Sequence, residues 1–375
     1  MSEHHDALEE LNKHTSLREK LIATHKSVSE IFPFIVRIAI VIYDPETSAL
    51  KTYMHSSGED NPLDNFQTYL DDAPSLKAIL NKGLPRVVNS MVTFDDGQHE
   101  HTKRIGRQGY AASYTLPMFN NGVFFGFLFF NSDEKDVFSE SVLRQIDVYS
   151  HLISLMVVNE LVSIHTLSAV VKATGRITHE RDPETGSHLD RMSRYSRIIA
   201  STLADKYHLN DEYIEHLFMF SPLHDIGKIS IPDNILLKPD KLNENEKNIM
   251  QTHARKGREM IDDLLQNFGL ENIQHIDMLR NIAEFHHETI NGKGYPAGLK
   301  GDDIPIEARI VAVADVFDAL TSIRPYKEAW SNSNAFQYLS ELAGETLDHD
   351  CVNALINNVD KIEEIQKKFK ENAYG

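Results

Sequence analysis

One stretch, from Ser139 to Thr178, limits the folds that are open to this chain. It contains no proline, and its first glycine is Gly175, so nothing before that point ends a helix early. Apolar residues recur in it at spacings of three and four, which is the period of a helix with a buried face. We therefore predict a helix over about 139–178, roughly 60 Å long at 1.5 Å per residue.

A helix of this length has more apolar surface than contacts with two small domains would cover. One interpretation is that it packs one stripe on each of the flanking domains. The other is that it pairs with a second copy of itself and joins a sensor to an effector. We favour the second interpretation and predict a homodimer that forms through this helix.

The residues before the helix read as mixed α/β. The segments "FIVRIAIVIYD" and "GYAASYTLPMFNNGVFFGFLFFNS" are rich in β-branched and aromatic residues, as strands require. In the second segment, Asn120, Asn121 and Gly122 between two apolar runs indicate a hairpin turn. The segment "APSLKAILNKG" predicts a short helix that ends at Gly83. We expect an antiparallel sheet with helices.

This order of elements resembles a GAF domain, and we assign residues 1–150 to a GAF-like sensory or dimerisation domain. The chain has one cysteine, Cys351, and none suited to a chromophore in this half. No cyclic-nucleotide motif could be placed either. A domain that serves dimerisation alone therefore stays open beside a sensor of an unknown small-molecule effector.

Beyond residue 180 the apolar period is helical nearly to the end of the chain, as in "HLDRMSRYSRIIASTLADKY" and "EARIVAVADVFDALTS". Loops with glycine and proline separate these segments. We predict that residues 151–375 form an all-α domain, so that the chain has two domains and a long connecting helix.

Composition narrows the class of protein. The formal net charge of -18 argues against binding a nucleic acid polymer, because such binding needs a basic face. A single cysteine fits a reducing cytoplasm. The polar N-terminus shows no signal peptide, and the most apolar stretch, "NGVFFGFLFF", is too short to span a bilayer. We expect a cytoplasmic protein without a membrane partner.

The helical half gathers the residue types that bind metals. Glu184 and His188 are four residues apart and share one face of a helical turn. Asp315 lies in the apolar helix "ARIVAVADVFDAL", where its charge is costly unless something such as a metal compensates it. The full set of five histidines and three carboxylates is Glu184, His188, His224, Asp225, His253, His286, His287 and Asp315.

Eight such groups are too many for one ion, so we predict two or three divalent metal ions. Histidine and carboxylate ligands without sulfur favour iron, with manganese as the alternative, over structural zinc. Asp225 has two oxygens and is a natural bridge between neighbouring ions. Two ions close together lower the pKa of a bridging water and neutralise a phosphate, so that hydroxide attacks phosphorus.

The motifs "HDIGK", "HHETINGKGYP" and "RPYK", in this order, resemble the HD-GYP family of cyclic dinucleotide phosphodiesterases over roughly residues 175 to 360. The resemblance implies an HD-type helical fold, a multi-metal centre and hydrolysis of the bacterial second messenger cyclic di-GMP to linear pGpG. It also implies roles. The eight residues above correspond to the metal ligands, Lys228 to the lysine that meets the scissile phosphate, Arg324 and Lys327 to residues that hold substrate phosphate, and Tyr295 and Pro296 to the loop beside the site.

Asp225 and Lys228 are thus the expected catalytic residues. The physical reading of the basic residues agrees, because arginine suits bidentate phosphate recognition and lysine acts as a point charge. Family members that assemble three metals have a glutamate at the position of Glu184, so we predict a trinuclear centre, whose third ion could help a second cut to GMP. Asn291 and Ile323 differ from the aspartates that are common at these positions in the family. We expect these differences to affect affinity or specificity and not activity.

Three alternatives stay open. The substrate could be 3',3'-cyclic GMP-AMP, since the base contacts cannot be read from sequence. An inert receptor of cyclic dinucleotide would typically have lost metal ligands, and all eight positions here hold ligating residues. A phosphohydrolase of mononucleotides is disfavoured by the loop at Tyr295 and by "RPYK".

Overall fold

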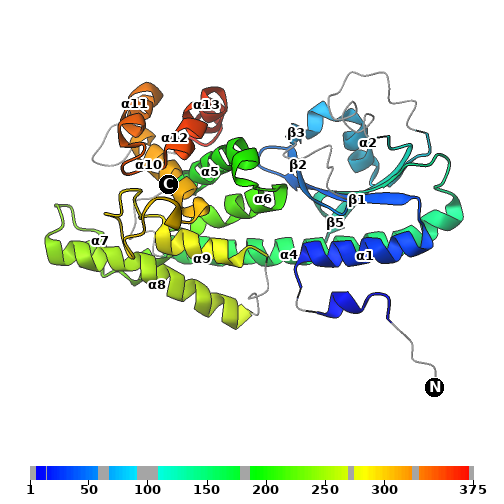
Figure 1. Cartoon of the computed structure of the whole chain (residues 1–375), viewed down its shortest axis with the longest axis horizontal. Coiled ribbons are helices and arrows are strands. Elements are labelled where there is room, and N and C mark those ends of the chain that lie inside the picture. Colours follow the sequence, from blue (N-terminus) through cyan, green and yellow to red (C-terminus); the bar gives the residue numbers. More distant parts are fainter. Residues whose placement is uncertain are drawn as a thin grey trace. The chain divides into compact units, whose positions relative to one another are not determined.

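The computed structural model of the chain describes residues 6–13, 15–57, 67–90, 109–177, 186–268, 274–322 and 329–370. The chain forms two compact units, which are described separately (Figure 1). The first is Met1–Val162 with Asn210–Glu212, and the second is Ser163–Leu209 with Tyr213–Gly375. The division therefore falls within the long helix.

The first unit is built on a six-stranded sheet with the order β3-β2-β1-β6-β5-β4, in which every neighbouring pair is antiparallel. The predicted hairpin joins β5 to β6, and Asn121 and Gly122 have the positive φ angles, 50° and 80°, that these two residues tolerate. The prediction of an antiparallel sheet with helices is confirmed. The strands are β1 (Ile35–Asp44), β2 (Ala49–His55), β3 (Gln67–Tyr69), β4 (Arg86–Val88), β5 (Ala112–Asn120) and β6 (Val123–Ser132).

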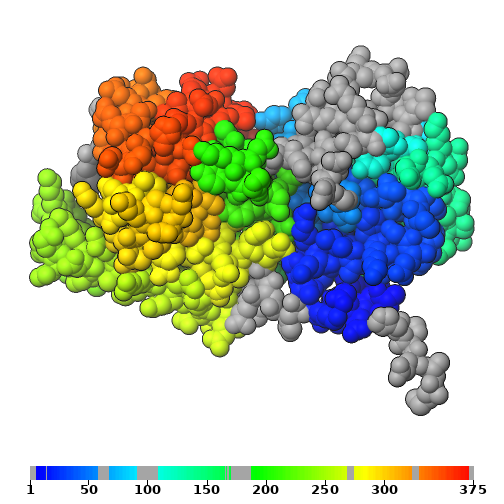
Figure 2. Space-filling view, in the orientation of Figure 1, coloured from blue at the N-terminus to red at the C-terminus, as the bar shows by residue number. Residues whose placement is uncertain are grey.

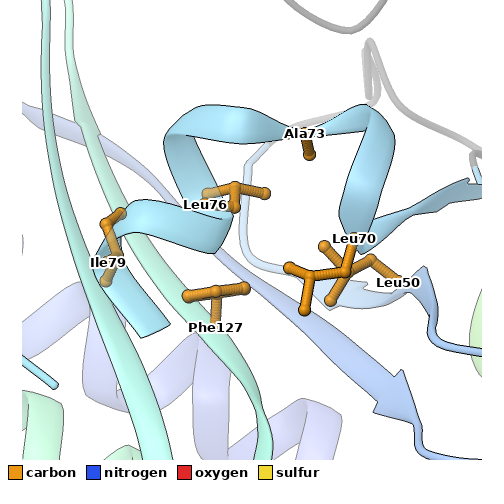
Figure 3. Packing of buried hydrophobic residues seen from close by; sticks show 6 residues of the cluster. All are labelled: Leu50, Leu70, Ala73, Leu76, Ile79 and Phe127. Carbon is orange, nitrogen blue, oxygen red and sulfur yellow. The ribbon is translucent and has the colours of Figure 1, made fainter. Parts of the chain in front are cut away.

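Helix α2 (Pro74–Lys82) covers part of one face of this sheet and ends, as predicted, at Gly83, which has φ 63°. Figure 3 shows its apolar side chains beside the sheet. They form one cluster with the short helix η2 (Leu70–Asp72) and two strands. The buried members of the cluster are Leu50, Leu70, Ala73, Leu76, Ile79 and Phe127.

Two more helices belong to this half of the chain. Helix α1 (Leu17–Ile31), preceded by the 3-10 turn η1 (Glu9–Asn12), begins with a capping box of Ser16 and Glu19. The predicted long helix is present as α4 (Glu140–Ile177). Two tyrosine hydroxyls reach it from within the first unit: Tyr114 donates to Asp147 and Tyr53 donates to Glu160, over 2.5 and 3.1 Å.

Along α4 the two faces differ. Ile146, Ile153 and Val157 are buried, whereas Val148 and Leu155 are each 68% exposed. By length and composition alone, Glu140–Ile164 is apolar enough to cross a membrane, a test that core helices of soluble proteins also pass. A third of the most apolar window is buried within the fold, which fits a helix packed on one side.

The second unit is helical, as predicted. Its central helix is α10 (Ile306–Thr321), which has buried residues on nearly every side, including Val313 and Phe317. Phe317 packs edge-on against Tyr195 and stacks on Phe336. The other helices are α5 (Gly186–Tyr207), α6 (Asp211–Phe220), α7 (Asp233–Leu236), α8 (Glu244–Phe268), α9 (Ile276–Phe285), α11 (Asn332–Leu342), α12 (His349–Ile356) and α13 (Val359–Lys368).

Three short 3-10 turns complete this unit: η4 (Ser221–Leu223), η5 (Ile226–Ser230) and η6 (Gly301–Asp303). In Figure 1 and in the space-filling view of Figure 2, α11 to α13 (orange to red) gather at one end of the domain. Helix α5 packs against both α10 and α12.

Candidate metal centre

Seven of the eight predicted ligands come together in the second unit, and they fall into two groups. In each group the ligand atoms lie within 4.8 Å of one another. The residues come from α5, the turn between η4 and η5, α8, the two positions that follow α9, and α10. One group is His188, His224 and Asp315, and the other is Asp225, His253, His286 and His287.

Asp225 lies between the two groups. Its Oδ2 atom is 3.1 Å from Nε2 of His224, and its Oδ1 atom is 3.2 Å from Nε2 of His253. The same Oδ1 is 3.5 Å from Nε2 of His286. One carboxylate oxygen therefore faces each group, which is the arrangement that a bridging ligand needs.

Lys228 follows on the η5 turn, and its Nζ atom is 2.8 Å from Oδ2 of Asp225. The ammonium group therefore lies beside the candidate ligands. Burial alone would raise the pKa of Asp225, but Lys228 and His224 outweigh it and hold that pKa well below its usual range. The carboxyl group is ionised, as a metal ligand must be.

A glycine brings the two sides of the centre into contact. A Cβ atom on Gly227 would stand 1.9 Å from the backbone oxygen of His253 and 2.5 Å from the backbone nitrogen of Gly257. Only a residue without Cβ lets the η5 turn approach the backbone of α8 so closely. This contact is what places Asp225 beside His253.

Backbone carbonyls fix three of the imidazoles. The Nδ1 atoms of His224, His253 and His286 lie 3.0, 2.7 and 2.9 Å from a carbonyl oxygen three or four residues earlier in the chain. A carbonyl can only accept, so each Nδ1 carries the hydrogen and each Nε2 keeps its lone pair. In this tautomer Nε2 is the metal-binding atom.

The centre fits divalent ions. Within the described part of the chain, Nε2 of His253, Nε2 of His286 and Oδ1 of Asp225 are buried atoms that make no hydrogen bond. Burial lowers the pKa of His286, and burial together with His286 lowers that of His287 well below its usual value. Neutral imidazoles around an ionised carboxylate are the protonation states that bind a metal ion.

A buried carboxylate outside the predicted set also reaches the centre. Asp318, fully buried on α10, has Oδ2 2.8 Å from Nδ1 of His188. It lies one helical turn after Asp315 in the same apolar helix, and that spacing is the sequence signal that could have found it.

The loop after His287 carries Tyr295 and Pro296. The ring of Tyr295 lies 4.7 Å from the ring of His287, centroid to centroid, so this loop borders the two ligand groups. The buried carboxylate of Glu288 accepts hydrogen bonds from the backbone N–H groups of three consecutive residues, Ala297 to Leu299, over 2.6 to 3.0 Å. Glu288 therefore holds the loop in place.

Three predicted site residues lie outside the described residues. Glu184 falls within 178–185, and Arg324 and Lys327 fall within 323–328. The third metal position and the phosphate contacts of these two basic residues stay predictions.

Residues 183–351 match the family model of the HD domain. These matched residues lie within the region that resembles the HD-GYP family, and that resemblance is confirmed.

Two curated relatives illustrate the match. The "Cyclic di-GMP phosphodiesterase response regulator RpfG" of Xanthomonas campestris pv. campestris is 42% identical over 232 residues, which are 62% of this chain and 57% of the relative. The "3'3'-cGAMP-specific phosphodiesterase 2" of Vibrio cholerae is 34% identical over 249 residues, 63% of this chain and 46% of the relative. The chain thus spans about half the length of the curated relatives that it matches.

The first unit is similar to solved GAF domains. The phycoerythrobilin-bound GAF domain of a cyanobacterial phytochrome matches 40% of this chain and 90% of its own, with 16% identity and a TM-score of 0.32. This likeness concerns the fold, and no ligand or activity follows from it.

Proposed function

We propose that this protein is a metal-dependent phosphodiesterase that hydrolyses cyclic di-GMP to linear pGpG. The observation that carries the proposal is the position of Asp225, whose two oxygens lie 3.1 and 3.2 Å from imidazoles of two ligand groups. Bound divalent ions would activate water and offset the charge of a phosphodiester. The names of the relatives in Xanthomonas and Vibrio support a cyclic dinucleotide as the substrate.

The residues around the ions would have separate tasks. Asp225 would contact the ions of both groups, and each of the other ligands would contact the ion of its own group. The ammonium of Lys228, 20% exposed beside Asp225, can donate to a phosphate oxygen at the centre. The ring of Tyr295 would border the substrate, while Arg324 and Lys327 would hold its phosphates.

Iron, with manganese as the alternative, is the metal that we propose, because the donors are imidazole and carboxylate without sulfur. We also propose a third ion held by Glu184, on the resemblance alone. It would help a second cleavage of pGpG to GMP, and accumulation of pGpG as the sole product would contradict it.

The second candidate substrate is 3',3'-cyclic GMP-AMP, since one of the relatives carries that specificity in its name. The two substrates share both phosphodiester linkages and differ in one base. A test of the enzyme therefore has to offer both at equal concentration.

The test is turnover by protein purified without oxygen, with the products separated by chromatography. We expect hydrolysis that stops with a chelator, and a loss of at least about 100-fold in kcat for Lys228→Met. Lys247, exposed on α8 and paired with Glu244, gives the matched control Lys247→Met, which should retain activity. Metal-loaded protein that binds either dinucleotide without cleaving it would show an inert receptor instead, and faster cleavage of a mononucleotide would show a general phosphohydrolase.

We further propose that the protein is cytoplasmic. We also propose that two copies of it pair through α4. Val148, Leu155 and Val162 are exposed and seven residues apart, and Leu152 and Asn159 complete the alternating spacing of four and three. This is the heptad pattern of a two-stranded coiled coil, in which one polar residue sets the register. Such pairing could carry a signal from the first unit to the HD domain.

The mass of the protein in solution tests the pairing. Leu155→Glu should give a monomer by light scattering, because it places a charge in the seam. Val123→Glu, at another exposed apolar site of the same unit, should leave the dimer intact. A wild-type monomer, or a dimer that survives Leu155→Glu, would overturn this proposal without affecting the proposed activity.

A further inference from the structure

The two ligand groups differ in how their imidazoles are supported. His224, His253 and His286 each have Nδ1 against a backbone carbonyl, whereas His188 has Nδ1 2.8 Å from a carboxylate oxygen of Asp318. We propose that Asp318 is a positioning residue that makes His188 a stronger ligand and thereby raises the metal affinity of the His188–His224–Asp315 group. This inference depends on the proposed metal centre but not on the substrate.

Hydrogen bonds hold the Asp318 carboxylate in one position and stabilise its negative charge. Its Oδ1 accepts from Nε of Arg191 over 2.7 Å, and its Oδ2 accepts from Nη2 of Arg191 over 2.9 Å. The hydroxyl of Ser322 donates to Oδ2 over 2.8 Å. The carboxylate is therefore an anion held by several donors.

Arg191 is itself fixed from a second direction. Its Nη1 donates to the backbone oxygen of Phe369 over 2.9 Å, and the Phe369 ring lies 3.9 Å from the guanidinium carbon of Arg194. Arg191 and Arg194, both in the N-terminal half of α5, thus contact Phe369, the residue that follows α13. The guanidinium that orients Asp318 has little freedom to turn away, because all these groups except Phe369 are more than nine-tenths buried.

The chemical consequence follows from the charge. A carboxylate at Nδ1 attracts the ring proton more strongly than a carbonyl does, so it leaves more electron density at Nε2. Nε2 of His188 is 3.7 Å from Oδ1 of Asp315, on the side where an ion would lie. The anion also locks the ring orientation. The ion of this group should therefore be held more tightly than if His188 faced a neutral acceptor.

Asparagine at position 318 isolates this effect. Each oxygen of the carboxylate faces at least one donor: Nε of Arg191 at Oδ1, and His188, Arg191 and Ser322 at Oδ2. An amide NH2 must face one of these donors whichever way it turns. The variant Asp318→Asn therefore loses the charge and at least one hydrogen bond while it keeps nearly the same shape.

The matched control is Asp348→Asn. Asp348 is also buried, and its Oδ2 accepts from Nη1 of Arg309 over 2.9 Å. Its Oδ1 caps α12 through the backbone N–H of Cys351, a task that asparagine performs equally well. This variant breaks a buried arginine–aspartate pair, but its described bonds do not go to a predicted ligand.

The experiment is a chelator titration of each variant with metal content read by elemental analysis. For Asp318→Asn we expect one ion to be lost at a roughly 10- to 100-fold lower chelator concentration, with the remaining metal unchanged. For Asp348→Asn we expect the wild-type curve. In addition, the ¹⁵N shifts of the His188 ring in metal-free protein should move in Asp318→Asn and not in Asp348→Asn.

Thermal unfolding of the metal-free variants separates this result from misfolding. If Asp318→Asn does not fold, Arg191→Lys provides the second variant, since it keeps Asp318 but loses the two-point hold. Wild-type metal affinity and an unmoved His188 signal in a folded variant would overturn the inference. A wild-type chain that binds no metal would overturn the proposed function itself, so the two failures can be told apart.

Discussion

Replacing Gly227 by alanine should separate the two halves of the metal centre. The added Cβ would stand 1.9 Å from the backbone oxygen of His253, whereas real Cβ atoms keep at least 3.0 Å from such an atom. The η5 turn and α8 would have to part by about 1 Å, and a displacement of that size costs roughly 100-fold in rate when it misplaces reacting groups.

The same displacement acts on metal binding. Oδ1 of Asp225 and Nε2 of His253 are 3.2 Å apart, and they sit on the two sides that are pushed away from each other. Metal–ligand distances tolerate deviations of about 0.2 Å, so an ion could no longer contact both at full strength. Overpacking of this kind also costs about 1–3 kcal/mol of stability.

The assay is metal content and kcat of Gly227→Ala beside Gly257→Ala. A Cβ on Gly257 would lie 3.4 Å from the backbone nitrogen of Gly227, which is ordinary contact, and alanine favours the helix by about 1 kcal/mol. We expect loss of metal and of about 100-fold or more in kcat for the first variant, and near wild-type values for the second. Full metal content and activity in Gly227→Ala would refute the close-contact reasoning.

Three more outcomes are expected. Glu288→Ala should raise KM for the dinucleotide more than it lowers kcat in steady-state kinetics, because the loop with Tyr295 loses the acceptor of its three N–H groups; an effect on kcat alone would contradict this role. Burial raises the pKa of the Cys351 thiol well above its usual range, so a thiol reagent at pH 8 should react only after denaturation, and rapid labelling of folded protein would contradict that burial. Removal of metal should lower the melting temperature, since an ion at 100 times its Kd stabilises the fold by about 2.7 kcal/mol; an unchanged melting curve would count against a bound ion.

Much of the fold could be predicted because local rules dominate it. The period of three and four and the lack of helix breakers gave α4 within a residue at each end. The residues Asn121 and Gly122 identified the β5–β6 turn because few other residues accept positive φ.

The clustering of seven of the eight candidate ligands could also be predicted, because the charge of a carboxylate in an apolar helix is costly unless something compensates it. The close approach at Gly227 could not, since it depends on the path of α8 past the η5 turn. The role of Glu288 could not be predicted either, because its hydrogen-bond partners are backbone N–H groups nine to eleven residues later, in a loop. The spacing of Asp318 and Asp315 on one helix is visible in the sequence, but it does not tell the two aspartates apart. The structure does, because Nδ1 of His188 from α5 lies against Asp318.

The metal content of the whole chain, purified without oxygen and read by elemental analysis, tests the central claim most directly. The two ligand groups around Asp225 predict at least two ions per chain, chiefly iron, and the third position predicts a value near three. Asp225→Asn should lower that value, because Asp225 faces both groups. A wild-type chain that binds fewer than two ions under these conditions would contradict the metal centre on which the proposed hydrolysis depends.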